Sequence, residues 1–140
     1  MKLKILFFLL ICAACSDDDA IPPVSCDNVG CTLQFVTINV KVQDQDGVNI
    51  PLDDFKVTDK ITGDDLTASY TDTELDQFRQ SGSYPLYDDR FVQGNQNEKR
   101  GIVFSGAIDG EDVVNSSYVV QADCCHVSLF SGNLSITLNR

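Results

Sequence analysis

The chain contains no tryptophan and only one histidine, and it lacks the common catalytic motifs. It has no G-x-S-x-G elbow, no Walker A loop and no dinucleotide-binding glycine pattern, so the sites that those motifs build are not indicated. The lone histidine, His126, follows two cysteines in a predicted strand, where a surface or packing role is more common than that of a catalytic base. Glycan-binding sandwiches usually present exposed aromatic platforms, and there is no tryptophan here to supply one. These absences favour a non-enzymatic protein.

Basic residues are also scarce. Lysine and arginine number 10 against 21 aspartates and glutamates, which gives a formal net charge of −11. Removal of residues 1–14, which contain Lys2 and Lys4, would change this charge to −13. So acidic a chain is a poor partner for nucleic acid and for anionic lipid headgroups. Because the carboxylates are scattered mainly over predicted turns, we interpret them as a solvated surface. A carboxylate-based hydrolase, which needs two carboxyls in one cleft, is the less favoured alternative.

Long apolar runs are missing except at the start of the chain. Lys2 and Lys4 precede an unbroken apolar run at residues 5–11, and the small residues Ala13 and Ala14 stand just before Cys15. A charged start, a short apolar core and a small-residue cleavage site are typical of a secretory signal. The run is well short of the roughly 20 residues that a membrane-spanning helix needs. We therefore expect residues 1–14 to be a cleaved signal peptide.

The residues around the predicted cleavage point carry a resemblance. Ala13-Ala14-Cys15 resembles the lipobox of bacterial lipoproteins, with Cys12 at the position usually held by leucine. The resemblance implies that Cys15 is diacylated on sulfur and becomes the new N-terminus. The following Ser16-Asp17-Asp18-Asp19 is similar to the surface-export tag of Bacteroidetes-type lipoproteins. It implies an outer-membrane protein exposed at the cell surface. The alternative is a periplasm-facing protein in which these acids simply begin a solvated tether.

We expect residues 15–30, with the pair Pro22-Pro23, to form a lipidated tether, and residues 31–140 to form one domain. Four cysteines would remain after cleavage and lipidation: Cys26, Cys31, Cys124 and Cys125. An even number in an exported protein indicates two disulfides, and four cysteines allow three connectivities. One connectivity is local and needs a strained vicinal bridge. We favour the other two, which cross-link the N-terminal segment to a late strand. A Cys-Cys-His metal site at residues 124–126 is disfavoured because adjacent strand residues point to opposite faces.

Apolar and polar residues alternate in several short segments, which indicates half-buried strands. The clearest lies at residues 35–43, and others lie at 55–59, 66–70, 101–108, 118–122 and 125–129. Residues 131–133 predict a hairpin into a last strand at 134–138, and Pro85 confines residues 84–92 to an edge or a bulge. Thr71 and Glu74 fit a capping box, so a short helix or an irregular crossover is expected over residues 71–82. The pattern predicts an all-β protein, a single sandwich of about seven or eight strands.

The stretch VKVQDQDGVNIPLDDFKVTDKITGDDL, residues 40–66, resembles the opening strands of carboxypeptidase-regulatory-like (transthyretin-like) and immunoglobulin-like modules. Those modules often begin with a V-x-V-x-D-x-x-G-x-x-[IV] strand and turn. The resemblance implies an immunoglobulin-like or transthyretin-like sandwich. It also implies a non-catalytic accessory or binding role.

Two sets of residues are candidates for a ligand site. The first is a patch formed by Tyr84, Tyr87, Asp88, Asp89 and Arg90, although packing of an edge strand is the favoured interpretation of these residues. The second comprises calcium candidates in the acidic turns, Asp44, Asp46, Asp53 and Asp54, together with residues 109–112. The EF-hand pattern is incomplete there, so a plain turn is favoured and we expect no metal or other cofactor. We expect a membrane-anchored module for binding, adhesion or assembly with an envelope protein or glycan. A calcium- or glycan-dependent binding domain is the alternative.

Overall fold

The computed structural model describes residues 25–139 of the chain. In chain order these residues form β1 (Thr37–Asp44), β2 (Asp54–Asp59), α1 (Asp72–Ser81), β3 (Ser83–Asp88), the short 3₁₀ turn η1 (Asp89–Phe91), β4 (Lys99–Ile108), β5 (Glu111–Ala122), β6 (Val127–Ser131) and β7 (Ser135–Leu138).

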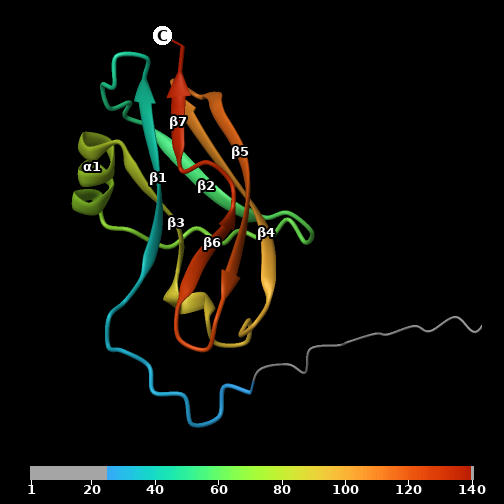
Figure 1. Ribbon diagram of the computed structural model, residues 1–140. Helices are drawn as coiled ribbons and strands as arrows, with labels where there is room; N and C mark the ends of the chain where they lie inside the picture. The colour runs from blue at the N-terminus through green and yellow to red at the C-terminus, as the bar shows by residue number, and fades with distance from the viewer. Residues whose placement is uncertain (1–24, 140) are drawn as a thin grey trace, which may run out of the picture.

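The strands make two sheets that pack face to face (Figure 1). One sheet has three strands in the order β3-β1-β7, and the other has four in the order β2-β4-β5-β6. All neighbours are antiparallel except β1 and β7, which run parallel. The predicted all-β sandwich is therefore confirmed, with seven strands in the described part of the chain.

Alternation of side chains explains why the two sheets share one core. In β1, Ile38, Val40 and Val42 are buried, whereas Thr37 and Asn39 between them are exposed. Buried side chains of β2, β3, β4 and β5, and of Leu52 in the loop before β2, meet them between the sheets; the largest are Tyr84, Phe104, Leu52, Ile102, Val57 and Val120. Burial of apolar area on this scale is the main stabilising contribution to the fold.

The predicted short helix and its limits are confirmed. The side chain of Thr71 accepts a hydrogen bond from the N–H of Glu74, and the Glu74 carboxylate accepts one from the N–H of Thr71, which completes the capping box. Gly82 ends the helix with a left-handed backbone. Phe78 of the helix packs edge-on against Phe55 at 6.2 Å between ring centroids. This contact fixes α1 beside the sandwich.

Two predictions about strands are wrong. Residues 66–70 do not form a strand, because their pairing is limited to an isolated bridge at Asp65 and a hydrogen bond from the N–H of Leu66 to Val57. Residues 131–133 do not make a hairpin, because the chain crosses there to the other sheet and β7 pairs with β1. At this crossing the hydroxyl of Tyr118 donates to the carbonyl of Asn133, and Gly132 lies against the Tyr118 ring, where a side chain would collide.

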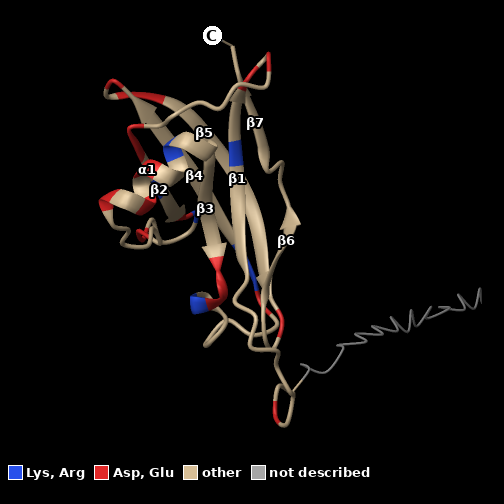
Figure 2. Cartoon of the chain, turned by 90° about the vertical axis from the view of Figure 1, so that its left-hand side faces the viewer, with Lys and Arg blue, Asp and Glu red and all other residues tan. Residues whose placement is uncertain are grey.

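The two ends of the sandwich carry different segments (Figure 1). The segment that leads from residue 25 into β1 lies at one end, together with η1 and the turn between β5 and β6. The loop between β1 and β2, the turn between β4 and β5 and the C-terminus of β7 lie at the opposite end. Acidic residues occupy the loops at that opposite end (Figure 2). The N–H of Asp109 donates to the Asp53 carboxylate there, so two turns distant in the sequence are neighbours.

Candidate functional site

An open groove lies between α1 and the outer face of the β1–β3 pair, with a volume of about 460 Å³. That volume falls within the range of small-molecule sites. Its polar side chains include Thr37 and Asn39, which point away from the core because they alternate with buried residues. Its aromatic side chains are Phe35, Tyr70 and Phe78, and the last two meet edge-on at 4.9 Å between centroids. The groove thus combines ring surfaces with hydroxyl and amide groups.

An ion pair closes one side of the groove. The Nε of Arg90 donates to one carboxylate oxygen of Asp88 at 2.8 Å, and its Nη2 donates to the other at 2.5 Å. Asp88 is buried, whereas the Arg90 side chain is about half exposed (49%). The hydrogen bond to Asp88 raises the pKa of Arg90 above its ordinary value. Because Asp88 already compensates the guanidinium, this groove suits a neutral, hydroxyl-bearing ligand better than an anion.

The predicted patch at residues 84–90 is only partly present at the groove. Asp88 and Arg90 line it, but Tyr84 and Tyr87 are buried and do not form an exposed aromatic platform. The Tyr84 hydroxyl accepts from the N–H of Leu52 and donates to the carbonyl of Ile50. Residues three apart on a regular strand face opposite sides, but the register between β1 and β3 shifts between these two tyrosines, so both side chains turn inward.

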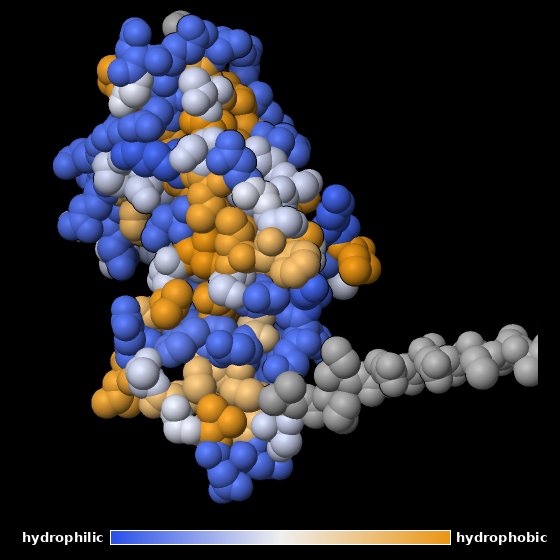
Figure 3. Space-filling model, in the orientation of Figure 1, coloured by the Kyte–Doolittle hydropathy of each residue, from blue (hydrophilic) through white to orange (hydrophobic). Residues whose placement is uncertain are grey.

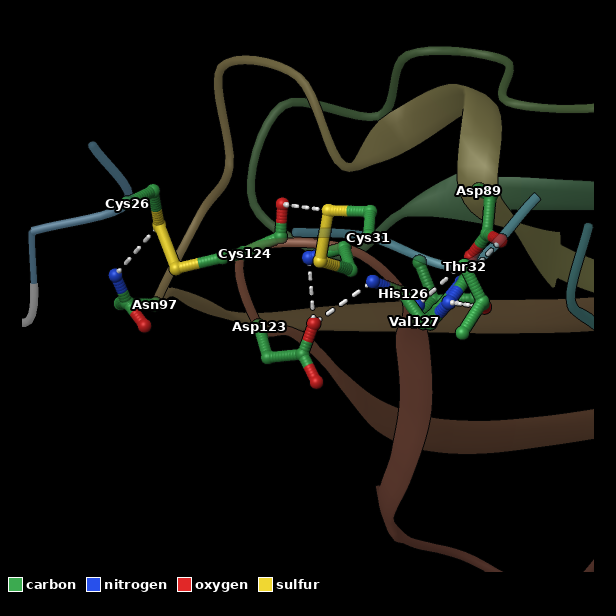
Figure 4. The surroundings of a disulfide bond; sticks show 10 residues. Cys26, Cys31, Thr32, Asp89, Asn97, Asp123, Cys124, His126 and Val127 are labelled. Carbon is green, nitrogen blue, oxygen red and sulfur yellow. Dashed lines mark hydrogen bonds and ion pairs between the residues drawn. A yellow bond between two sulfur atoms is a disulfide. The ribbon is translucent and has the colours of Figure 1, made fainter. Parts of the chain in front are cut away.

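Two disulfides fasten the N-terminal segment to the turn between β5 and β6 (Figure 4). Cys26 is bonded to Cys124, and Cys31 is bonded to Cys125, with Cα–Cα distances of 5.2 and 5.3 Å. This is one of the two cross-linking connectivities that the sequence left open. All four thiols are used, so they are not free to bind a metal with His126. The bridge at Cys26 also ties part of the predicted tether to the sandwich.

A hydrogen-bond network reinforces the two bridges. The hydroxyl of Thr32 lies 2.9 Å from Nε2 of His126, and Nδ1 of the same ring lies 2.8 Å from the Asp89 carboxylate (Figure 4). The N–H groups of Val36 and Val127 donate to the two carboxylate oxygens of Asp89. Burial by itself raises the pKa of Asp89. The hydrogen bonds from His126, Val36 and Val127 outweigh burial and lower this pKa below its ordinary value. We call the two disulfides and this network the N-terminal clamp.

Asp89 therefore belongs to the clamp and not to a ligand patch, which corrects the expectation for that residue. The clamp joins residues that are far apart in the sequence. Asp89 lies 37 positions before His126, and Thr32 lies 94 positions before it. No local pattern connects such residues, which is why sequence reasoning missed the network. The sequence draws attention to His126 as the lone histidine, directly after Cys125, but it does not indicate that Asp89 and Thr32 are its partners.

A hydroxyl, an imidazole and a carboxylate in this order also resemble the arrangement that activates a nucleophile in hydrolases. The resemblance is limited to the order of the hydrogen-bonded groups. The residues that line the groove do not include Thr32 or His126, so a ligand held in the groove would not meet the hydroxyl. Both oxygens of Asp89 are engaged by backbone N–H groups that hold three chain segments together. We therefore assign the network a structural role in the clamp.

The acidic turns use their carboxylates to shape the backbone. One oxygen of Asp44 accepts from the N–H groups of Asp46 and Val48, which is the hydrogen bonding of a turn. Asp53 accepts from the backbone N–H of Asp109 in the β4–β5 turn, and Asp54 accepts from the N–H of its neighbour Phe55. Among residues 25–139, no three His, Cys, Asp or Glu side chains are grouped so that they could share a metal ion.

The predicted lipid acceptor Cys15 and the tag Ser16, Asp17, Asp18 and Asp19 lie outside the described residues. In the described part of the chain, no helix has the length and apolar character needed to cross a membrane. No family model matches the chain, and comparisons with curated proteins and with solved structures found no similar protein. The site is interpreted below from its own residues.

Proposed function

We propose that this protein is a non-enzymatic lipoprotein that is held at the outer membrane by lipid on Cys15 and exposed at the cell surface. It acts there as a binding, adhesion or accessory module of a cell-envelope complex. The signal-like start, the small residues before Cys15 and the acidic tag behind it support the anchor. Two or more acyl chains give stable attachment, whereas one gives only marginal attachment.

The N-terminal clamp is the observation that carries this proposal. It fixes the segment that follows the proposed anchor to one end of the sandwich through Cys26 and Cys31. A force on the N-terminal segment is then carried through the two disulfides to the turn between β5 and β6, so it does not act on β1 alone. The opposite end, with its acidic loops, would face away from the membrane (Figure 2). Such an arrangement suits a displayed domain.

Replacement of the acceptor tests the anchor. Cys15→Ser should move the protein from the membrane fraction to the soluble fraction, and Cys12→Ser is the matched control because it removes a neighbouring thiol and leaves the acceptor. Retention of the Cys15→Ser protein in membranes would contradict the anchor. Protease added to intact cells should digest the wild-type protein, and full protection of the protein would place it on the periplasmic side.

The groove supports a second element of the proposal, which is binding of a neutral glycan. Sugars present apolar ring faces and many hydroxyls, and the groove offers aromatic rings beside Thr37, Asn39 and Ser69. The polar groups of the Asp88–Arg90 pair add donors and acceptors without a large net charge. The acidic turns are less suited to a calcium-dependent mode, because one oxygen each of Asp44 and Asp53 is engaged with backbone N–H groups and no three acidic side chains among residues 25–139 are grouped so that they could share an ion.

A glycan array followed by calorimetry on the glycans that bind tests the groove. Ser69→Trp should block the groove and Asn39→Ala should remove an amide, each weakening binding by about tenfold or more, which equals about 1.4 kcal/mol. Ser128→Trp is the control, because Ser128 is equally exposed but lies on β6 outside the groove. Equal affinity of the Ser69→Trp and control proteins would contradict glycan binding at this site.

A further inference from the structure

Large apolar side chains are exposed along the short segment with which the described chain begins, at one end of the molecule. Six such side chains are exposed among residues 25–139, and three of them, Val29, Leu33 and Phe35, fall in one short segment. Leu33 is fully exposed (105%), and Phe35, which also lines the groove beside α1, is 59% exposed. Single apolar residues are ordinary on a surface, whereas a gathered set marks an interaction site. We call these three residues the N-terminal apolar patch; orange atoms show at this end in Figure 3.

The clamp holds the patch in a defined position. On one side of Leu33 and Phe35, Cys31 is disulfide-bonded and Thr32 is hydrogen-bonded to the His126 ring. On the other side, the N–H of Val36 is hydrogen-bonded to the Asp89 carboxylate. The backbone that carries these apolar side chains is thus ordered before any partner binds. Less conformational entropy is lost on binding when a segment is ordered beforehand, so a small patch can contribute usefully.

We propose that the N-terminal apolar patch lies against the lipid bilayer that holds the anchor, with Leu33 inserted among the lipids. The inference rests on the lipid on Cys15 that is proposed above. Eleven residue steps separate Cys15 from Cys26, and an extended chain of that length reaches at most about 40 Å. The patch follows directly after Cys26, at the same end of the sandwich. The bilayer surface is therefore within reach of the patch, whereas the loops at the far end of the sandwich point away from it.

The size and charge of the patch favour lipid over a protein partner. A stable protein interface buries about 800 Å² on each partner and uses roughly 20–30 residues a side, far more than three apolar side chains provide. Shallow insertion into a bilayer needs only a few apolar groups beside an existing anchor. Because anionic headgroups would repel the acidic chain, the proposal is for contact with zwitterionic lipid. Of the carboxylates nearby, those of Asp89 and Asp123 are hydrogen-bonded within the clamp or its turn, and that of the exposed Asp27 accepts from the Ser25 hydroxyl.

The absence of tryptophan allows a direct test with the full-length lipidated protein in phosphatidylcholine vesicles. Leu33→Trp places the only tryptophan in the patch, and Val48→Trp places it at another exposed position (60% against 105% for Leu33) in the loop between β1 and β2 at the opposite end. Emission of the Leu33→Trp protein should shift to shorter wavelength on reconstitution, and brominated lipids should quench it strongly. The Val48→Trp protein should show neither effect. Flotation of the vesicles reports separately whether each protein is anchored.

The outcomes separate this inference from the anchor on which it rests. If both proteins float with the vesicles but Leu33→Trp is neither shifted nor quenched, lipid contact is refuted and the anchor stands. If the proteins do not float, the anchor and the lipid contact both fail. If Leu33→Trp is shifted without vesicles and sedimentation shows self-association, the patch binds a second copy of the chain and the lipid assignment is overturned.

Discussion

The contribution of each disulfide of the clamp to the free energy of unfolding should depend strongly on whether the other disulfide is present. Each bridge alone closes a long loop, because its cysteines are 98 or 94 residues apart. Once one bridge is present, however, the other closes only a small ring made of residues 26–31 and 124–125. Since loop-closure entropy grows with the logarithm of loop length, the second bridge constrains the unfolded chain much less than the first.

The magnitudes follow from the loop lengths. A loop of nearly 100 residues corresponds to about 4.7 kcal/mol, and the small ring corresponds to about 2.5 kcal/mol. Replacement of Cys31 and Cys125 by serine should therefore lower the free energy of unfolding by about 2.5 kcal/mol, and so should replacement of Cys26 and Cys124. Replacement of all four cysteines should lower it by about 7 kcal/mol, more than the sum of the two single effects.

Guanidinium unfolding followed by far-ultraviolet circular dichroism measures these differences in the residues 15–140 chain, with the wild-type protein as reference. A four-serine protein that is already unfolded in buffer would agree with the expected loss if the wild-type protein is stable by less than about 7 kcal/mol. The reasoning would be refuted if either single removal cost about 4.7 kcal/mol or more, or if the two single costs summed to the cost of the fourfold replacement.

Three further predictions concern the sandwich itself. Gly106→Ala should destabilise the fold by about 1–3 kcal/mol, because the added Cβ would lie 2.6 Å from the buried side chain of Leu52. Gly101→Ala on the same strand, whose Cβ would have its nearest contact at 3.5 Å, should be close to neutral. Equal melting temperatures of the two variants would contradict this prediction. Thr71→Ala should cost about 1 kcal/mol by removing the helix cap, and an unchanged unfolding midpoint would argue against a role for the capping box in stability. The N–H of Thr62, the guanidinium of Arg100 and the N–H of Ile61 lower the pKa of Asp59 to about 2. Because the pKa in the folded state is lowered, the contribution of Asp59 to stability is present above its ordinary pKa near 4 and is lost as pH falls toward 2. Asp59→Asn should therefore flatten the dependence of melting temperature on pH over this range. An unchanged slope would exclude Asp59 as the cause.

The short-range features of the fold were predictable because they depend on neighbours in the chain. Alternation of valine and isoleucine with polar residues predicted β1, and the Thr71–Glu74 capping box predicted α1 together with its start. Pro85 was expected at an edge or a bulge, and β3 is an edge strand whose pairing with β1 is irregular beside that proline. In each case a few consecutive residues contain the whole physical cause.

Predictions that depended on distant partners were less successful. The run at residues 66–70 has strand-like alternation, but no neighbouring strand continues the pairing there. The turn at residues 131–133 looks like a hairpin, but Tyr118 packs against it from another strand and directs β7 to the other sheet. Packing of the strand was favoured for Tyr84 and Tyr87 over an exposed ligand patch, but that both turn toward the core follows from the irregular register beside Pro85, which the sequence does not show.

The sequence alone determined the fold class, because periodicity and turn spacing express it directly, and its first residues are the basis of the proposed anchor at Cys15. Only the tertiary structure decided which cysteines pair, that Asp89 and Thr32 meet at His126, and that a groove opens beside α1. The physical reason is that each of these features joins segments from separate strands and loops. Their proximity is produced by burial of one shared core, which no short stretch of the chain encodes.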